Sequence, residues 1–256
     1  MEGKTIFESS DWHCDPDGLI DEAKEFIRRG KEAKAIIVGG GDLLNLLPIG
    51  REKFNGARVV NELVQVLAGY PFYYVSGNHD PYRWVVELFR DFPNVRVVKR
   101  LEGKLAGKVY LFTHGHQWAI DWAFLRHLAP RFVEFMVDYF PKPWYRFCKW
   151  VGWMASEAKR QANTGYRERQ KYNDLTGIIW RNGIRFAQHH GCCVILGHTH
   201  TSGELRRFTG GNMGIISVMV DGGDLRDGTY VVVERDARLE CLWKASNGDQ
   251  LIFQAA

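Results

Sequence analysis

Five short clusters of potential metal-binding side chains occur along the chain, each directly after a run of residues typical of a β-strand. All of them offer oxygen or nitrogen donors: Asp11 with His13, Asp42, Asn78 with His79 and Asp80, His114, and His198 with His200. Carboxylate, imidazole and amide oxygen without a thiolate suit Mn, Fe or Zn rather than a cysteine-rich structural zinc site. Because these donors outnumber what one ion needs, the sequence predicts a centre with two divalent metal ions.

The spacing within two of the clusters favours a shared site. Asp11 and His13 are two residues apart, as are His198 and His200. In an extended segment, side chains alternate between the two faces, so both members of such a pair can point the same way. One such pair alone would be weak evidence, whereas five similar strand ends in one chain indicate a functional metal site.

The elements that must position these residues alternate between strands and helices in the first half of the chain. The sequence predicts strands within residues 4–13, 33–45, 71–80 and 108–118, with helices at 17–29, at 55–67 and from Pro81 onward. Such alternation is typical of right-handed crossovers and a largely parallel sheet. Ligands bind outside the carboxyl ends of such strands, so we expect the clusters to converge there.

The C-terminal part of the chain has a different pattern. A further apolar strand precedes His198, and the segments "IISVMVDGG", "TYVVVERD" and "RLECLWKA" are strand-like, with tight turns and no helix between them. The sequence therefore predicts a mostly antiparallel C-terminal portion.

The clusters together resemble the signature of the calcineurin-like metallophosphoesterase superfamily. The chain has "DWH", "GGD", "GNHD", "THGH" and "GHTH" in the order in which that superfamily has D-x-H, G-D, G-N-H-D/E, H and G-H-x-H. The resemblance implies an α/β fold, the αββα sandwich, in which helices flank two central mixed β-sheets. It also implies a catalytic domain at 1–116 and 189–256, interrupted by a helical cap insertion at 117–188.

The resemblance implies a role for each cluster. One ion would be bound by Asp11, His13 and His200, the other by Asn78, His114 and His198, and Asp42 would bridge the two. His79 resembles the catalytic histidine of the superfamily, with Asp80 as its orienting partner. The implied reaction is hydrolysis of a phosphodiester or pyrophosphate bond by water that the two ions activate, with Mn preferred over Fe or Zn.

The insertion contains aromatic residues interleaved with lysine and arginine, as in "FPKPWYRFCKWVGWMA". A cap at this place, between "HG" and "GHTH", resembles that of the UDP-2,3-diacylglucosamine hydrolases, which cleave a lipid-linked pyrophosphate in lipid A biosynthesis. Those enzymes have G-N-R-D and H-G-D where this chain has "GNHD" and "HGH". Two interpretations stay open: the aromatic stripe packs on the catalytic domain, or it binds acyl chains or the surface of a bilayer.

The substrate class also has alternatives. Besides a lipid-linked or other phosphorylated substrate, the sequence permits a nucleotide or cyclic-nucleotide phosphodiesterase or a nuclease. A non-catalytic protein-interaction scaffold is disfavoured because the chain keeps every histidine of the signature. Candidate substrate contacts are Asn45, His116, Arg167, Arg169 and Lys171.

The composition agrees with a folded globular protein. Of 256 residues, 45% are hydrophobic and 25% charged, and the formal net charge of +4 comes without a long basic run, so nucleic acid is permitted but not indicated. Five cysteines without regular spacing make no disulfide framework, and the N-terminal sequence lacks the apolar core of a signal peptide. We therefore expect a cytoplasmic protein, with peripheral contact at the inner membrane face through the cap. The oligomeric state is not predicted.

Overall fold

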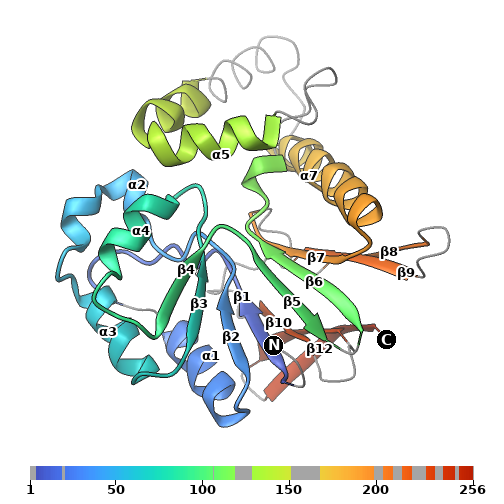
Figure 1. Ribbon diagram of the computed structural model, residues 1–256, viewed down its shortest axis with the longest axis horizontal. Helices are drawn as coiled ribbons and strands as arrows, with labels where there is room; N and C mark the ends of the chain where they lie inside the picture. The colour runs from blue at the N-terminus through green and yellow to red at the C-terminus, as the bar shows by residue number, and fades with distance from the viewer. Residues whose placement is uncertain are drawn as a thin grey trace.

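The computed structural model (Figure 1) describes residues 4–18, 21–105, 107–118, 129–150, 168–198, 204–209, 215–220, 229–233, 239–245 and 248–255. Within these residues, two β-sheets lie at the centre and helices lie outside them. The first sheet has the strand order β12-β11-β10-β1-β2-β3-β4, and the second has the order β5-β6-β7-β9-β8. This arrangement confirms the predicted α/β fold with two mixed sheets flanked by helices.

The strands of the first sheet are β1 (Ile6–Ser9), β2 (Ile36–Gly39), β3 (Phe72–Val75), β4 (Val95–Val98), β10 (Thr229–Val233), β11 (Leu239–Ala245) and β12 (Gly248–Ala255). Those of the second are β5 (Leu101–Leu105), β6 (Lys108–Thr113), β7 (Cys193–Leu196), β8 (Glu204–Thr209) and β9 (Ile215–Val220). Strands β1 to β4 are parallel, and β10 to β12 are antiparallel. The parallel N-terminal half was predicted, but β4 and β5 were not.

The helices are α1 (Asp21–Glu32), α2 (Leu46–Ile49), α3 (Arg58–Leu67), α4 (Tyr82–Leu88), α5 (Ala129–Tyr139) and α7 (Glu168–His190), with short 3-10 turns η1 (Arg51–Phe54) and η2 (His116–Trp118). Residues 141–150 are also helical. Buried side chains recur on one face of α3 at Val59, Val60, Leu63 and Leu67, the spacing expected of a helix packed on a sheet. Among the described residues, no helix combines the length and the apolar character needed to cross a bilayer.

The apolar core has three parts, which correspond to the interfaces between four layers. One lies between the first sheet and α1 and α3, and it includes Phe26, Leu63 and Phe72. The second lies between the two sheets and includes Val38 and Phe112. The third lies between the second sheet and α7. Each sheet therefore buries both faces, which explains the continuous apolar runs of β2 and β7.

The predicted cap region contains α5 and most of η2 and α7. Figure 1 shows α5 beyond the carboxyl ends of β3 and β6. Helix α7 has another position, because its buried Ile179 and Trp180 pack in one cluster with Val194 and Leu196 of β7. It forms the outer layer on the second sheet. The domain boundaries at 117 and 188 stay a prediction.

Candidate metal centre

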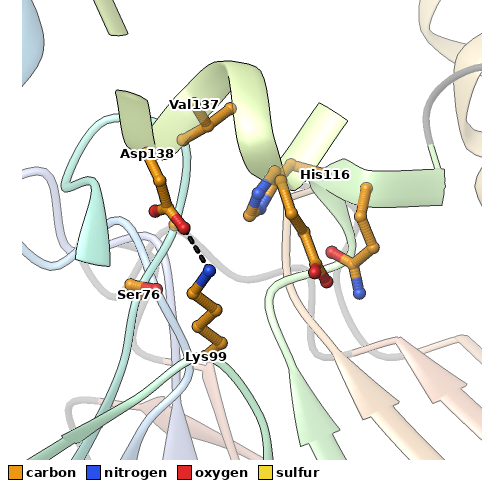
Figure 2. Close-up of a pocket in the computed structure, with 8 residues that line it drawn as sticks. Ser76, Lys99, His116, Val137 and Asp138 are labelled. Atoms are coloured by element: carbon orange, nitrogen blue, oxygen red, sulfur yellow. Dashed lines mark ion pairs between the residues drawn. The ribbon is translucent and has the colours of Figure 1, made fainter. Parts of the chain in front are cut away.

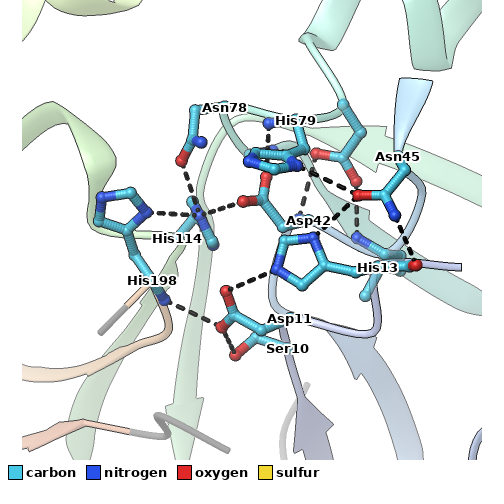
Figure 3. A network of polar contacts seen from close by, with 12 residues as sticks. Ser10, Asp11, His13, Asp42, Asn45, Asn78, His79, His114 and His198 are labelled. Carbon is cyan, nitrogen blue, oxygen red and sulfur yellow. Dashed lines mark hydrogen bonds and ion pairs between the residues drawn. The ribbon is translucent and has the colours of Figure 1, made fainter. Parts of the chain in front are cut away.

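The predicted metal ligands that the structure describes lie together at the carboxyl ends of strands from both sheets (Figure 3). Asp11, Asp42 and Asn78 follow β1, β2 and β3 of the first sheet, while His114 and His198 follow β6 and β7 of the second. Strands β6 and β7 are parallel to each other, as β1, β2 and β3 are. The expected convergence therefore occurs, and it joins the edges of two sheets rather than one.

Two groups of potential ligands share a carboxylate. His13, Asp42 and His79 form one, and Asp42, His114 and His198 form the other; within each group, the ligand atoms lie within 4.8 Å of one another. Asp42 is thus the residue common to both, as a bridging ligand would be. The assignment of each ligand to an ion stays a prediction.

The second group has the dimensions of a metal site. The Nε2 atom of His114 lies 3.1 Å from Oδ1 of Asn78, 3.1 Å from Oδ2 of Asp42 and 3.2 Å from Nδ1 of His198. Two ligand atoms that each lie about 2.1 Å from one ion at a right angle are about 3 Å apart. A single ring N–H cannot serve three such neighbours at once, so a cation suits this donor set better than hydrogen bonds alone.

Asp11 and His13 hold the other side of the centre. The Asp11 carboxylate is buried, and its Oδ2 accepts hydrogen bonds from the Ser10 hydroxyl at 2.6 Å and from the backbone N–H of His198 at 2.9 Å. Its Oδ1 lies 3.8 Å from Nε2 of His13, and the His13 ring lies 4.7 Å from that of His79. The bond to His198 fixes the loop after β7 to the loop after β1.

The backbone at these positions is strained in a common way. Asp11, His13, Asp42 and His198 have φ values of 54°, 46°, 53° and 73°, and they are four of the six non-glycine residues with positive φ in the described chain. This left-handed conformation costs residues with a Cβ roughly 1–2 kcal/mol each. Strain of this kind is maintained where function requires a particular side-chain direction.

The glycines of the motifs are required by close packing. A Cβ on Gly77 would lie 2.1 Å from Oδ1 of Asp42, and one on Gly197 would lie 2.6 Å from Oδ2 of Asp11. Gly41, at φ +104°, would place a Cβ 2.6 Å from that of His114. Backbone and ligand side chains are therefore in direct contact, with no room for a methyl group.

This packing makes Gly77→Ala a specific test of the centre. The added methyl group must displace the Asp42 carboxylate, so we expect the affinity for Mn²⁺, measured by titration calorimetry, to fall about 10- to 100-fold. Gly177→Ala is the matched control, because Gly177, like Gly77, is not at positive φ, and the added methyl group would meet only Nη1 of Arg181, at an ordinary contact distance of 3.6 Å. Equal affinities for the two variants would contradict this account of the glycine.

Asp80 does not orient His79, and that prediction is wrong. Its buried carboxylate accepts hydrogen bonds from the backbone N–H groups of Asp42, Leu43 and Gly77 and from the Tyr74 hydroxyl, at 2.5–3.1 Å. Residues 78–80 form a bend, in which the ring of His79 faces Asn45 while the carboxylate of Asp80 faces these backbone groups and Tyr74. Asp80 instead fixes the loop after β2 to the loop after β3.

Asn45 orients His79 instead. Its Oδ1 lies 3.1 Å from Nδ1 of His79 and 3.1 Å from Nδ1 of His13, while its Nδ2 donates to the carbonyl of His13 and to Oδ1 of Asp15. The amide of Asn45 thus has protein partners on its oxygen and on its nitrogen, and its contact with substrate stays a prediction. Fixing Nδ1 leaves Nε2 of each ring directed away from Asn45.

The charges in the centre act on one another. Burial alone would raise the pKa of Asp42, but the neighbouring His114 ring holds that pKa well below its ordinary value. Burial alone would lower the pKa of His114, but Asp42 and Asp11 raise it to about 9. Burial lowers the pKa of His79, and burial together with the nearby His114 lowers that of His116 to about 3. The metal-free centre therefore retains its carboxylate charge on Asp42, which attracts cations.

His116 lies at the rim of the centre, half-buried, with its ring 5.5 Å from that of His114. Together with Ser76, Lys99, Val137 and Asp138, it lines a small pocket beneath α5 (Figure 2). Its Nδ1 has no hydrogen-bond partner among the described residues. Substrate contact by His116 stays a prediction.

The remaining predicted residues are not placed in the site. His200 and Arg167 lie outside the described residues, and Arg169 and Lys171 are described only as part of the backbone of α7. The sequence interpretation missed Tyr145, whose ring lies 6.2 Å from that of His79 in an edge-on arrangement. The aromatic stretch was noted, but nothing in its spacing indicated which ring reaches the centre.

The calcineurin-like phosphoesterase family matches residues 5–202. Among solved structures, the chain is similar to a dimetal phosphatase from Danio rerio at 12% identity and a TM-score of 0.50, with 100% of both chains covered. A search of curated proteins finds no match.

Two further solved structures have lower TM-scores. A phosphodiesterase from an archaeon has 12% identity and a TM-score of 0.40, with 97% of this chain and 98% of that chain covered. Vps29 from Entamoeba histolytica, in complex with zinc, has 12% identity and a TM-score of 0.46, with 98% of both chains covered.

Proposed function

The chain belongs to the calcineurin-like phosphoesterase family, and from this premise we propose that it is a metal-dependent phosphoesterase that hydrolyses the phosphodiester or pyrophosphate bond of a lipid-linked substrate. The observation that supports the chemistry is the pair of three-residue ligand groups that share Asp42. When bound, two divalent ions there would supply an activated water molecule and would neutralise charge on the phosphoryl oxygens.

The side chains of the centre divide the remaining tasks. Asp42 would fix the two halves of the centre relative to each other. Its Oδ2 faces His114, and its Oδ1 accepts a hydrogen bond from the backbone N–H of His79 at 2.7 Å. His79, oriented by Asn45, would contact the phosphoryl oxygens or protonate the leaving group. His13 and His114 would serve as ligands, and no nucleophilic side chain of the protein is required.

The helical segment at 141–150 supports an amphiphilic substrate. Tyr145 brings this segment to the edge of His79, and Lys149 lies 5.3 Å from the centre of the Tyr145 ring. Farther along the segment, Phe147 and Trp150 are about half exposed. A phosphate at the metal centre would thus have a cation and aromatic rings beside it, where the polar and acyl parts of one molecule would meet complementary groups.

The first substrate to test is UDP-2,3-diacylglucosamine, because the predicted cap occupies the same place in the chain as in the hydrolases that cleave it. The Mn-loaded protein is incubated with this lipid in detergent micelles, and with bis-p-nitrophenyl phosphate as a water-soluble diester, and the products are identified by mass spectrometry. The matched control is the Asp42→Ala variant under the same conditions, which excludes a contaminating hydrolase.

Each outcome has a distinct meaning. Release of UMP and lipid 1-phosphate would support the lipid-linked pyrophosphate as substrate. Hydrolysis of the soluble diester alone would remove the lipid substrate and favour a nucleotide phosphodiesterase. No hydrolysis of either compound, with both ions bound, would contradict the phosphoesterase proposal and favour a non-catalytic role.

A further inference from the structure

We propose that the segment 129–150 forms a surface that docks the protein on an anionic lipid bilayer, with its aromatic rings in the interface and its lysines and arginines at the lipid phosphates. This surface is the aromatic–basic face of the protein. The inference goes beyond the proposed catalytic function and does not depend on it, since docking on a bilayer would require neither a bound metal ion nor hydrolysis.

The aromatic–basic face concentrates the exposed apolar surface of the described chain. Six large aromatic side chains here are between 42% and 55% exposed: Phe132, Phe135, Tyr139, Phe140, Phe147 and Trp150. Elsewhere in the described residues, the exposed large apolar side chains are Val86 and Val109. An exposed cluster of this kind is typical of an interaction site rather than of a solvated surface.

The rings form continuous rows rather than scattered contacts. In the first row, the ring centres of Phe132 and Trp144 are 6.0 Å apart, those of Trp144 and Phe147 are 5.6 Å apart, and those of Phe147 and Trp150 are 6.2 Å apart. A second row begins on α5, where the ring centre of Phe135 lies 4.9 Å from that of Tyr139. It also lies 5.8 Å from the ring centre of Phe140, which directly follows the helix. Because α5 and residues 141–150 are joined through the first row, one apolar surface extends over both helices.

The exposed charged side chains of the aromatic–basic face are all positive. Arg131, Lys142, Arg146 and Lys149 are exposed. The only acidic residues of the segment, Glu134 and Asp138, are paired with Arg100 and Lys99 on the catalytic side of α5; Figure 2 shows the second pair. Arg83 of α4 adds a further cation, 4.8 Å from the centre of the Tyr139 ring.

This combination favours a bilayer over a second copy of the chain. Trp and Phe on one face together with Lys and Arg are typical of segments that lie in the headgroup region. In a symmetric dimer, the same cations would face one another and repel. Each Lys or Arg near an anionic membrane strengthens binding about fivefold, so four of them together contribute roughly several hundredfold.

The test is co-sedimentation of the full-length protein with sucrose-loaded vesicles of phosphatidylcholine alone or with 30 mole percent phosphatidylglycerol. We expect binding to the anionic vesicles, weakened by 0.5 M NaCl, and much less binding to the neutral ones. The Arg146→Glu/Lys149→Glu variant should bind anionic vesicles at least about 25-fold more weakly, since two favourable charges are lost. The Phe147→Ser/Trp150→Ser variant should bind both kinds more weakly.

The matched control is Lys104→Glu/Lys108→Glu, which makes the same change of charge at two exposed positions of the β5–β6 hairpin. These positions lie at the start of β6, whereas the metal centre lies beyond its carboxyl end. Circular dichroism and the melting temperature establish that each variant is folded. Equal binding to both vesicle types, no binding, or the same loss in variant and control would overturn the proposal. A concentration-dependent dimer that Phe147→Ser/Trp150→Ser abolishes would assign the face to a second copy instead.

These readouts use no substrate and no metal ion. If the protein hydrolyses substrate in detergent but does not bind vesicles, the docking inference is wrong and the proposed function stands. If it binds vesicles but hydrolyses no substrate, the docking inference stands and the proposed function is wrong.

Discussion

The Asp42→Ala variant is expected to lose the metal centre as a whole, and with it at least about a thousandfold in turnover. Asp42 is the residue that belongs to both ligand groups, and it also accepts the backbone N–H of His79. Bound ions contribute several kcal/mol to stabilising the transition state, and about 1.4 kcal/mol corresponds to tenfold in rate. Metal content after dialysis against Mn²⁺, determined by plasma mass spectrometry, is the direct measurement.

Two controls make this result specific. Asp91→Ala removes an exposed carboxylate whose recorded ion pair is with its neighbour Arg90, and it should retain both ions and full turnover. Asp42→Asn keeps the size of the side chain and distinguishes loss of charge from loss of packing. Full occupancy by two ions in Asp42→Ala would show that this carboxylate does not bridge them.

The His79→Ala variant should keep its ions and lose about 10²- to 10⁴-fold in turnover, the range for removal of a general acid or base. His79 is oriented through Nδ1 by Asn45, and its ring lies between His13 and Tyr145. Its ligand atoms also lie near those of His13 and Asp42, so the structure itself permits a second role as a ligand. Metal content and turnover, measured on one preparation, distinguish the two roles.

For this prediction, His189→Ala serves as the matched control, because it removes an exposed histidine at the end of α7. A His79→Ala protein with one ion instead of two would identify His79 as a ligand. A variant with normal turnover would exclude it from the chemistry.

The sequence predicted where the centre lies because parallel strands impose a simple geometry. A polar cluster after each buried strand can only lie at the carboxyl edge, and Asp11, Asp42, Asn78, His114 and His198 do lie there. The sheet assignment was less complete. The strand β4 is four residues long and only partly buried, and β5 alternates buried and exposed residues around Gly103, so neither produces a continuous apolar run.

The supporting contacts of the centre could not be predicted in the same way. Asp80 was assigned to His79 because the two are adjacent in the chain, but its carboxylate binds backbone N–H groups of two loops and the hydroxyl of Tyr74. The residue that does orient His79, Asn45, lies 34 positions earlier, and it comes into reach only because β2 and β3 are neighbours. Contacts of this kind depend on the packing of loops, which local sequence patterns do not encode.

The position of the centre between the two sheets has a consequence for folding. Asp42 comes from the first sheet, and His114 and His198 come from the second, so the ligand group that these three residues form requires both sheets. An ion that binds only the native state adds to the free energy of unfolding, by about 2.7 kcal/mol at a hundred times its dissociation constant. Bound ions would thus act as a cross-link between the sheets and would make their separation and unfolding one cooperative event.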